Sequence, residues 1–140
     1  MYNIIIVICL FLLPGYANAH EDHAHGPANV PLQKGGILRS LETVHLELVY
    51  KNKMVKIYPF NVQVDPKMPG HLSSMRTNQF PVSATVELPK RKAIPLSLKD
   101  EGDHWTAQFD PQNAHRFTVF LFIKQGGHDD KVKWTIEPKD

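Results

Sequence analysis

Hydrophobic and polar residues alternate with a period of two in several short stretches of this chain. In the stretch TVHLELVY at 43–50, the apolar positions are Val44, Leu46, Leu48 and Tyr50, and the positions between them include His45 and Glu47. Successive side chains of a β-strand point to opposite faces, so this pattern predicts a strand with one buried face and one polar face.

Six further stretches show the same alternation, at residues 54–60, 82–88, 94–99, 104–109, 116–124 and 131–137. Short polar turns join most of them, and no stretch has the 3.6-residue apolar repeat of an amphipathic helix over a helix's length. The pattern predicts an all-β fold, an antiparallel immunoglobulin-like β-sandwich of about seven strands over residues 37–140. The connection at 61–81 is long for a compact domain, and connections of that length are often functional.

The first nineteen residues differ from the rest. A short apolar run ends in Ala17-Asn18-Ala19, a small-residue pattern typical of a signal-peptide cleavage site. We therefore expect residues 1–19 to be removed on export, with a periplasmic location and no stable membrane insertion afterwards. Cys9 is the one cysteine and lies in this leader, so the mature chain would have neither a disulfide nor a thiolate ligand.

Cleavage after Ala19 would leave a flexible histidine-rich arm at 20–36. His20, His23 and His25 lie within six residues, together with Glu21 and Asp22. Imidazole ligands suit copper, zinc and nickel, so the arm is predicted to bind a transition metal. As a new first residue, His20 would also offer its α-amine beside its ring, the arrangement of a copper-binding histidine brace. The alternative is a solvated histidine-rich end without a defined site.

Two other groups are candidate metal ligands. Met68, His71 and Met75 lie in the long connection, and their soft sulfur atoms would suit Cu(I), although methionines of this kind also fill gaps beneath loops. His45 and Glu47 are two residues apart on one strand and point the same way, so they would form half of a site facing the arm. The alternative for this pair is a solvated sheet face.

Composition and charge exclude several classes of function. The formal net charge is only +2, which gives no strong attraction to nucleic acid or to an anionic membrane. The sequence has no Gly-x-Ser-x-Gly elbow, no phosphate-binding glycine loop and no His-Glu-x-x-His motif. We therefore expect no enzymatic activity, unless it is the chemistry of a metal.

From Gly35 onward the chain resembles small periplasmic β-sandwich proteins and domains associated with heavy-metal efflux systems of the resistance-nodulation-division type. The similarity is carried by the histidine-rich HEDHAHG, the pair Gly35-Gly36, VHLELVY at 44–50 and VKIYPF at 55–60. It implies metal handling near such a pump, with periplasmic pump components as partners.

These features together favour an exported transition-metal-binding protein that buffers its ion or delivers it to an efflux system, with copper ahead of zinc. The first alternative is a copper oxidoreductase with an N-terminal histidine brace. The second is a β-sandwich interaction module that binds no metal.

Overall fold

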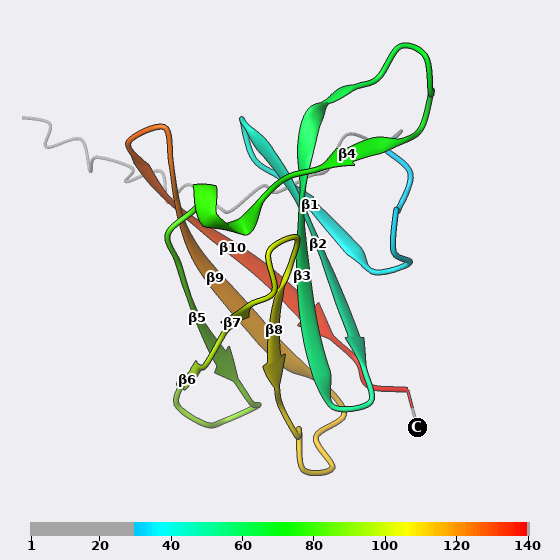
Figure 1. The fold of residues 1–140 in the computed structure, drawn as a ribbon. Helices are drawn as coiled ribbons and strands as arrows, with labels where there is room; N and C mark the ends of the chain where they lie inside the picture. The colour runs from blue at the N-terminus through cyan, green and yellow to red at the C-terminus, as the bar shows by residue number, and fades with distance from the viewer. Residues whose placement is uncertain (1–29, 140) are drawn as a thin grey trace, which may run out of the picture.

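The predicted β-sandwich is confirmed by a computed structural model, which describes residues 30–139 (Figure 1). Two antiparallel sheets pack face to face and account for most of the described chain. The predicted signal peptide and the predicted ligands His20, His23 and His25 lie outside the described residues. Within residues 30–139, no helix has the length and hydropathy needed to cross a membrane.

The first sheet carries the N-terminal strands. Its order is β1 (Ile37–Ser40), β2 (Val44–Lys51), β3 (Met54–Val64), β8 (Trp105–Gln108) and β7 (Lys99–Asp100), and β4 (Leu72–Ser74) also pairs with β3. β2 and β3 form a hairpin whose two turn residues, Asn52 and Lys53, have φ of 52° and 58°. Positive φ at both positions is the conformation of a type I′ hairpin turn, which matches the twist of the strands.

The second sheet has the order β10 (His128–Ile136), β9 (Phe117–Gln125), β5 (Val82–Glu87) and β6 (Ile94–Leu96). β9 and β10 form its longest hairpin, with Trp134 opposite Val119. The alternating burial along β9 follows the alternation of apolar and polar residues in the sequence. A single turn of 3-10 helix at Thr77–Gln79 precedes β5.

The core between the sheets is built from the apolar positions that the alternation predicted. Val44, Ile57, Val119 and Trp134 are all fully buried there. The indole N–H of Trp134 donates a hydrogen bond of 2.9 Å to the carbonyl of Ile37, which attaches β1 to the opposite sheet. The core therefore also holds the short strand that follows residue 36.

The stretch predicted as one strand at 94–99 is divided between the sheets. Ile94–Leu96 pairs with β5 in the second sheet, while Lys99–Asp100 pairs with β8 in the first. The chain crosses from one sheet to the other at Ser97 and Leu98, so a single continuous strand is ruled out. A period-two pattern does not reveal such a crossing, because each half keeps the same alternation.

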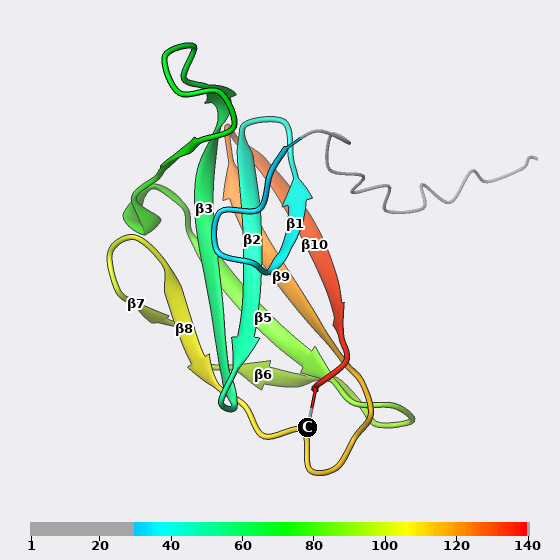
Figure 2. The same ribbon diagram turned by 90° about the vertical axis from the view of Figure 1, so that its right-hand side faces the viewer.

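The long connection at 61–81 contains more regular structure than its sequence indicated. β3 continues to Val64, β4 returns beside it, and the 3-10 turn follows. The β3–β4 loop extends past the end of the sandwich, as the side view shows (Figure 2). It lies at the same end of the molecule as the start of the described chain.

Candidate functional site

The outer face of β2 is covered by the segment at 30–36, and Glu47 is the centre of that contact. Its side chain is fully buried. The backbone amides of Gln33, Lys34 and Gly36 all donate to its carboxylate, at 2.8, 3.0 and 2.7 Å for the shortest contact of each. A carboxylate that accepts several backbone amides is satisfied although it is buried. Glu47 thus fixes the end of the predicted arm to the sandwich.

His45 lies on the same face of β2 and is also buried, with 5% of its surface exposed. Its Nδ1 has no hydrogen-bond partner among the described residues, and neither does the buried Oγ of Ser40, which is opposite it on β1. Burial lowers the pKa of His45 below its usual value of 6.5. The ring is therefore kept in its neutral form, the one that can bind a metal ion.

The interpretation of His45 and Glu47 as a solvated sheet face is wrong, because both side chains are buried. They do point away from the central core, as the alternation predicted, since Val44, Leu46 and Leu48 fill the other face. The segment at 30–36 lies over Glu47 and removes it from water. Their role as metal ligands stays a prediction, and both Glu47 oxygens are already occupied by amides.

Gln33 joins this segment to the β3–β4 loop. Its side-chain amide donates to the carbonyl of Gly70 at 3.1 Å, and its side-chain oxygen accepts the amide of Leu72 at 3.2 Å. The loop and the segment also come close together here, because a Cβ on Gly70 would lie in van der Waals contact with the ring of Pro31, at 3.4 Å. The point where the N-terminal segment reaches the fold is therefore in direct contact with the loop that carries Met68 and His71.

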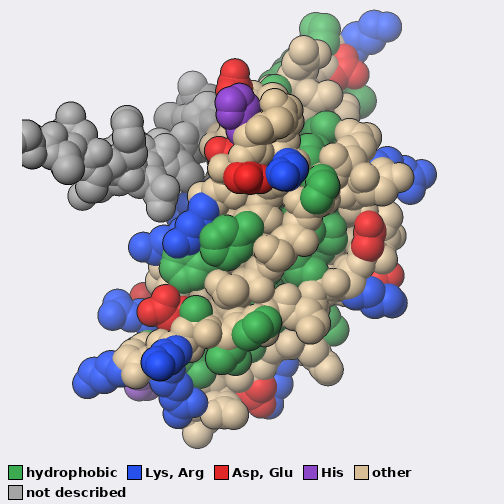
Figure 3. All heavy atoms as spheres, turned by 90° about the vertical axis from the view of Figure 1, so that its left-hand side faces the viewer, with side chains coloured by type: hydrophobic (Ala, Val, Ile, Leu, Met, Phe, Trp, Pro, Cys, Tyr) green, Lys and Arg blue, Asp and Glu red, His purple; other side chains and the backbone are tan. Residues whose placement is uncertain are grey.

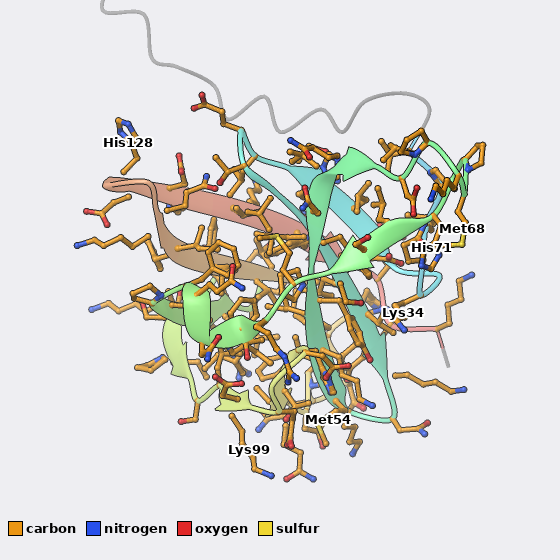
Figure 4. All side chains as sticks on the ribbon, turned by 45° about the horizontal axis from the view of Figure 1, so that its top comes forward. Lys34, Met54, Met68, His71, Lys99 and His128 are labelled. Atoms are coloured by element: carbon orange, nitrogen blue, oxygen red, sulfur yellow. The ribbon has the colours of Figure 1, made fainter. Side chains whose placement is uncertain are left out.

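Met68 and His71 lie together at the tip of this loop (Figure 4). The amide of His71 donates to the carbonyl of Met68 at 3.1 Å, which closes a tight turn. Met68 is 52% exposed and His71 is exposed as well, so both side chains are free to bind a ligand from solvent.

Met75 is placed differently from the other two residues of its predicted group. It follows β4, where its amide donates to the carbonyl of Pro59, and its side chain packs against the central core. The structure thus brings Met68 and His71 together and gives Met75 the gap-filling position that the sequence left open as its alternative. Among the described residues, no three His, Cys, Asp or Glu side chains converge on a position that could hold a metal ion.

Lys34, in the segment at 30–36, contacts the ring of Tyr58 on β3. The ammonium of Lys34 lies 5.3 Å from the centre of the Tyr58 ring, and that ring stacks on His104 at 4.8 Å. Burial, followed by the charges of Asp103 and Glu47, raises the pKa of Tyr58. Tyr58 therefore stays a neutral platform beneath Lys34.

Sequence reasoning missed Gln33, which makes the contact that positions the site. It precedes a lysine and two glycines, in a stretch without apolar periodicity, so nothing in the pattern marks it as fixed. Comparisons with family models, with curated protein sequences and with solved structures gave no match.

Proposed function

We propose that this protein is an exported transition-metal-binding protein, with copper preferred to zinc, that captures its ion through His20, His23 and His25. The loop residues Met68 and His71 receive or share the ion, and the loaded protein buffers it or passes it to a periplasmic component of an efflux pump. His45 is a further candidate ligand beneath the same segment.

The observation that supports this proposal most directly is the pair of hydrogen bonds from Gln33 to Gly70 and Leu72. They hold the N-terminal segment against the loop that carries Met68 and His71. His25 precedes Val30 by five residues, and an extended chain covers at most about 3.5 Å per residue. Because Pro31 already lies against Gly70, next to His71, a segment of this length is long enough to bring the imidazole of His25 to the loop.

The donor types support copper. Imidazole nitrogen binds both oxidation states of copper well, whereas thioether sulfur prefers Cu(I). The arm's histidines offer only nitrogen ligands, which bind both Cu(I) and Cu(II), whereas the loop offers one thioether and one imidazole. The loop is therefore expected to favour Cu(I) more strongly than the arm does. Because Met68 and His71 are exposed to solvent, ligands can exchange at the loop, as a carrier requires.

The test is a competition titration of the purified protein with Cu(I), Cu(II) and Zn(II) against chromophoric chelators. Replacing His20, His23 and His25 together by alanine should weaken copper binding by more than about 100-fold, because loss of direct ligands costs more than loss of the groups that orient them. Met68→Leu combined with His71→Ala should weaken Cu(I) binding more than Cu(II) binding.

The matched control combines Met54→Leu with His128→Ala. It removes the same two residue types at positions far from the loop tip (Figure 4), and it should leave all three affinities unchanged. Copper binding that survives the triple histidine variant would overturn the proposal and favour a β-sandwich interaction module.

A further inference from the structure

A hollow at the opposite end of the sandwich is separate from the proposed metal site. It has a volume of about 690 Å³ and is lined by the turn after β5, the loop between β8 and β9, and Glu137 after β10. Pockets for small ligands have volumes of roughly 300–1,000 Å³. The space is therefore large enough for a small organic molecule.

The turn on one side of the hollow is fixed by its backbone. The amide of Arg91 donates to the carbonyl of Leu88 at 3.1 Å, with Pro89 and Lys90 between them. Lys90 has a φ of 59°, in the left-handed region that usually requires glycine or asparagine at this position of a type II turn. The strained turn brings the guanidinium of Arg91 to the edge of the hollow.

The loop on the other side is equally constrained. The amide of Ala114 donates to the carbonyl of Pro111 at 3.0 Å, and the two residues between them, Gln112 and Asn113, have φ of 50° and 64°. Asp110 supports this turn, because its carboxylate accepts the amide of Gln112 at 2.9 Å and the ammonium of Lys53 at 2.6 Å.

Left-handed backbone at a residue other than glycine costs about 1–2 kcal/mol, and such strain is concentrated at functional sites. Lys90 and Gln112 carry this cost in the two turns that face the same hollow, whereas Asn113 is a residue type that adopts this conformation more readily. The two turns that line the hollow therefore have a defined backbone conformation without a ligand.

The charged residues of the lining match a ligand with one negative charge. Two positive side chains, Arg91 and Arg116, and one negative side chain, Glu137, give a net charge of +1 when His115 is counted as neutral. The side-chain contact of Arg91 with Gln112 is long, at 3.4 Å. A guanidinium has five N–H donors in a planar fork that fits a carboxylate in two-point contact.

Part of the remaining lining is apolar, and Gln112, Asn113 and His115 add polar groups. Leu88, Pro89, Pro111 and Ala114 line the hollow beside the charged groups. Figure 3 shows a group of Lys and Arg side chains at the lower left of the face in view, and others along its left and right sides. A ligand held in the hollow would direct a charged end to the arginines and an apolar body to the prolines.

We propose that this hollow binds a small monocarboxylate with an apolar body, with Arg91 and Arg116 contacting its carboxylate and Pro89, Pro111 and Ala114 contacting its body. The site is independent of metal binding at the opposite end. Glu137 makes the lining less favourable for a dianion.

The test uses benzoate as the probe, followed through the backbone amide resonances of the full protein. Benzoate should give saturable shifts in the amides of Leu88, Lys90, Arg91 and residues 112–116, whereas benzamide, its neutral counterpart, should give none that saturate. Arg91→Gln and Arg116→Gln should each weaken benzoate binding at least about fivefold, because each removes a charge-assisted hydrogen bond. The spectra of the free variants show whether the fold is kept.

Arg76→Gln is the matched control, because it removes an exposed arginine that does not line the hollow, and it should leave benzoate binding unchanged. Shifts scattered over the whole surface, or unaltered by both arginine variants, would overturn the proposal. Inorganic phosphate that binds as tightly as benzoate would replace the monocarboxylate with a general anion site and would overturn the assignment of ligand class.

Discussion

Gly36 donates its backbone amide to the buried carboxylate of Glu47 at 2.7 Å, and it has no room for a side chain of its own. A Cβ at this position would lie 2.1 Å from the carbonyl oxygen of Leu48. The close approach and the hydrogen bond depend on each other, because the segment must lie directly on β2 for its amides to reach the carboxylate of Glu47.

Glu47→Gln should lower the free energy of unfolding by about 2–3 kcal/mol, since the new side-chain amide would face backbone N–H donors and leave buried groups without partners. Chemical denaturation measures this loss. Glu87→Gln, on the exposed side of β5, is the control and should change stability by less than about 0.5 kcal/mol. Equal effects of the two variants would show that the segment contributes nothing to the fold.

Alanine substitution should destabilise the protein by different amounts at the two neighbouring glycines, Gly35 and Gly36. Gly36→Ala forces the backbone of β2 or of the segment to move, so we expect a loss of more than about 3 kcal/mol, beyond the usual range for overpacking. Gly35 has a φ of 76° but nothing within 4 Å of a Cβ, so Gly35→Ala should cost only about 1–2 kcal/mol of backbone strain. Thermal unfolding of both variants compares them, and the reverse order would contradict the contact described for Gly36.

Acidification should destabilise the protein through His45. Burial lowers its pKa in the folded state below the usual 6.5, so the unfolded chain takes up this proton first as the pH falls. The stability contribution of the neutral ring is present above pH 6.5 and is lost as the pH falls toward and through the lowered pKa. His45→Gln should therefore reduce the fall in unfolding free energy between about pH 7.5 and about pH 5.

His128→Gln is the control for this pH effect, because His128 is exposed at the β9–β10 turn. Its stability should follow the pH profile of the unchanged protein. If the two variants gave the same profile, His45 would not be the group responsible.

Trp134→Phe should detach β1 from the second sheet. The substitution removes the 2.9 Å hydrogen bond to the carbonyl of Ile37 and leaves space in a fully buried position. We expect a loss of about 2–4 kcal/mol, from an unsatisfied carbonyl and from the cavity together. Trp105→Phe is the control, because it removes the same atoms from a buried position in the first sheet. Hydrogen exchange at residues 37–40 should increase only in the Trp134 variant, which distinguishes the loss of the hydrogen bond to Ile37 from the effect of a cavity.

The long strands could be predicted from the sequence because each has one face in the central core. The alternation at Val44, Leu46 and Leu48 and the pattern at 117–123 depend on local spacing alone, which a sequence records directly. β1 was not predicted, since four residues that include Arg39 give too short a pattern. β4 has only three residues and was hidden in a stretch rich in proline and glycine.

The environment of His45 and Glu47 could not be predicted from the same pattern. Alternation shows which face a residue is on, but it does not show what covers that face. The covering segment at 30–36 has no periodicity of its own, and it is held by backbone amides, which every sequence has. For the same reason Gln33 gave no signal, whereas Met68 and His71 were recognised from their ligand chemistry.

The crossing of the chain at Ser97 and Leu98 has a consequence for self-association. It leaves β6 and β7 with three and two residues, so on that side neither sheet offers a long free edge to which a second chain could add a strand. On the other side, Arg39 donates to the carbonyl of Lys133 at 3.1 Å and Trp134 to that of Ile37, which ties the two edge strands β1 and β10 together. The short strands therefore disfavour amyloid-like strand addition on the first side, and on the second side the carbonyls of Ile37 and Lys133 are already occupied by side-chain donors.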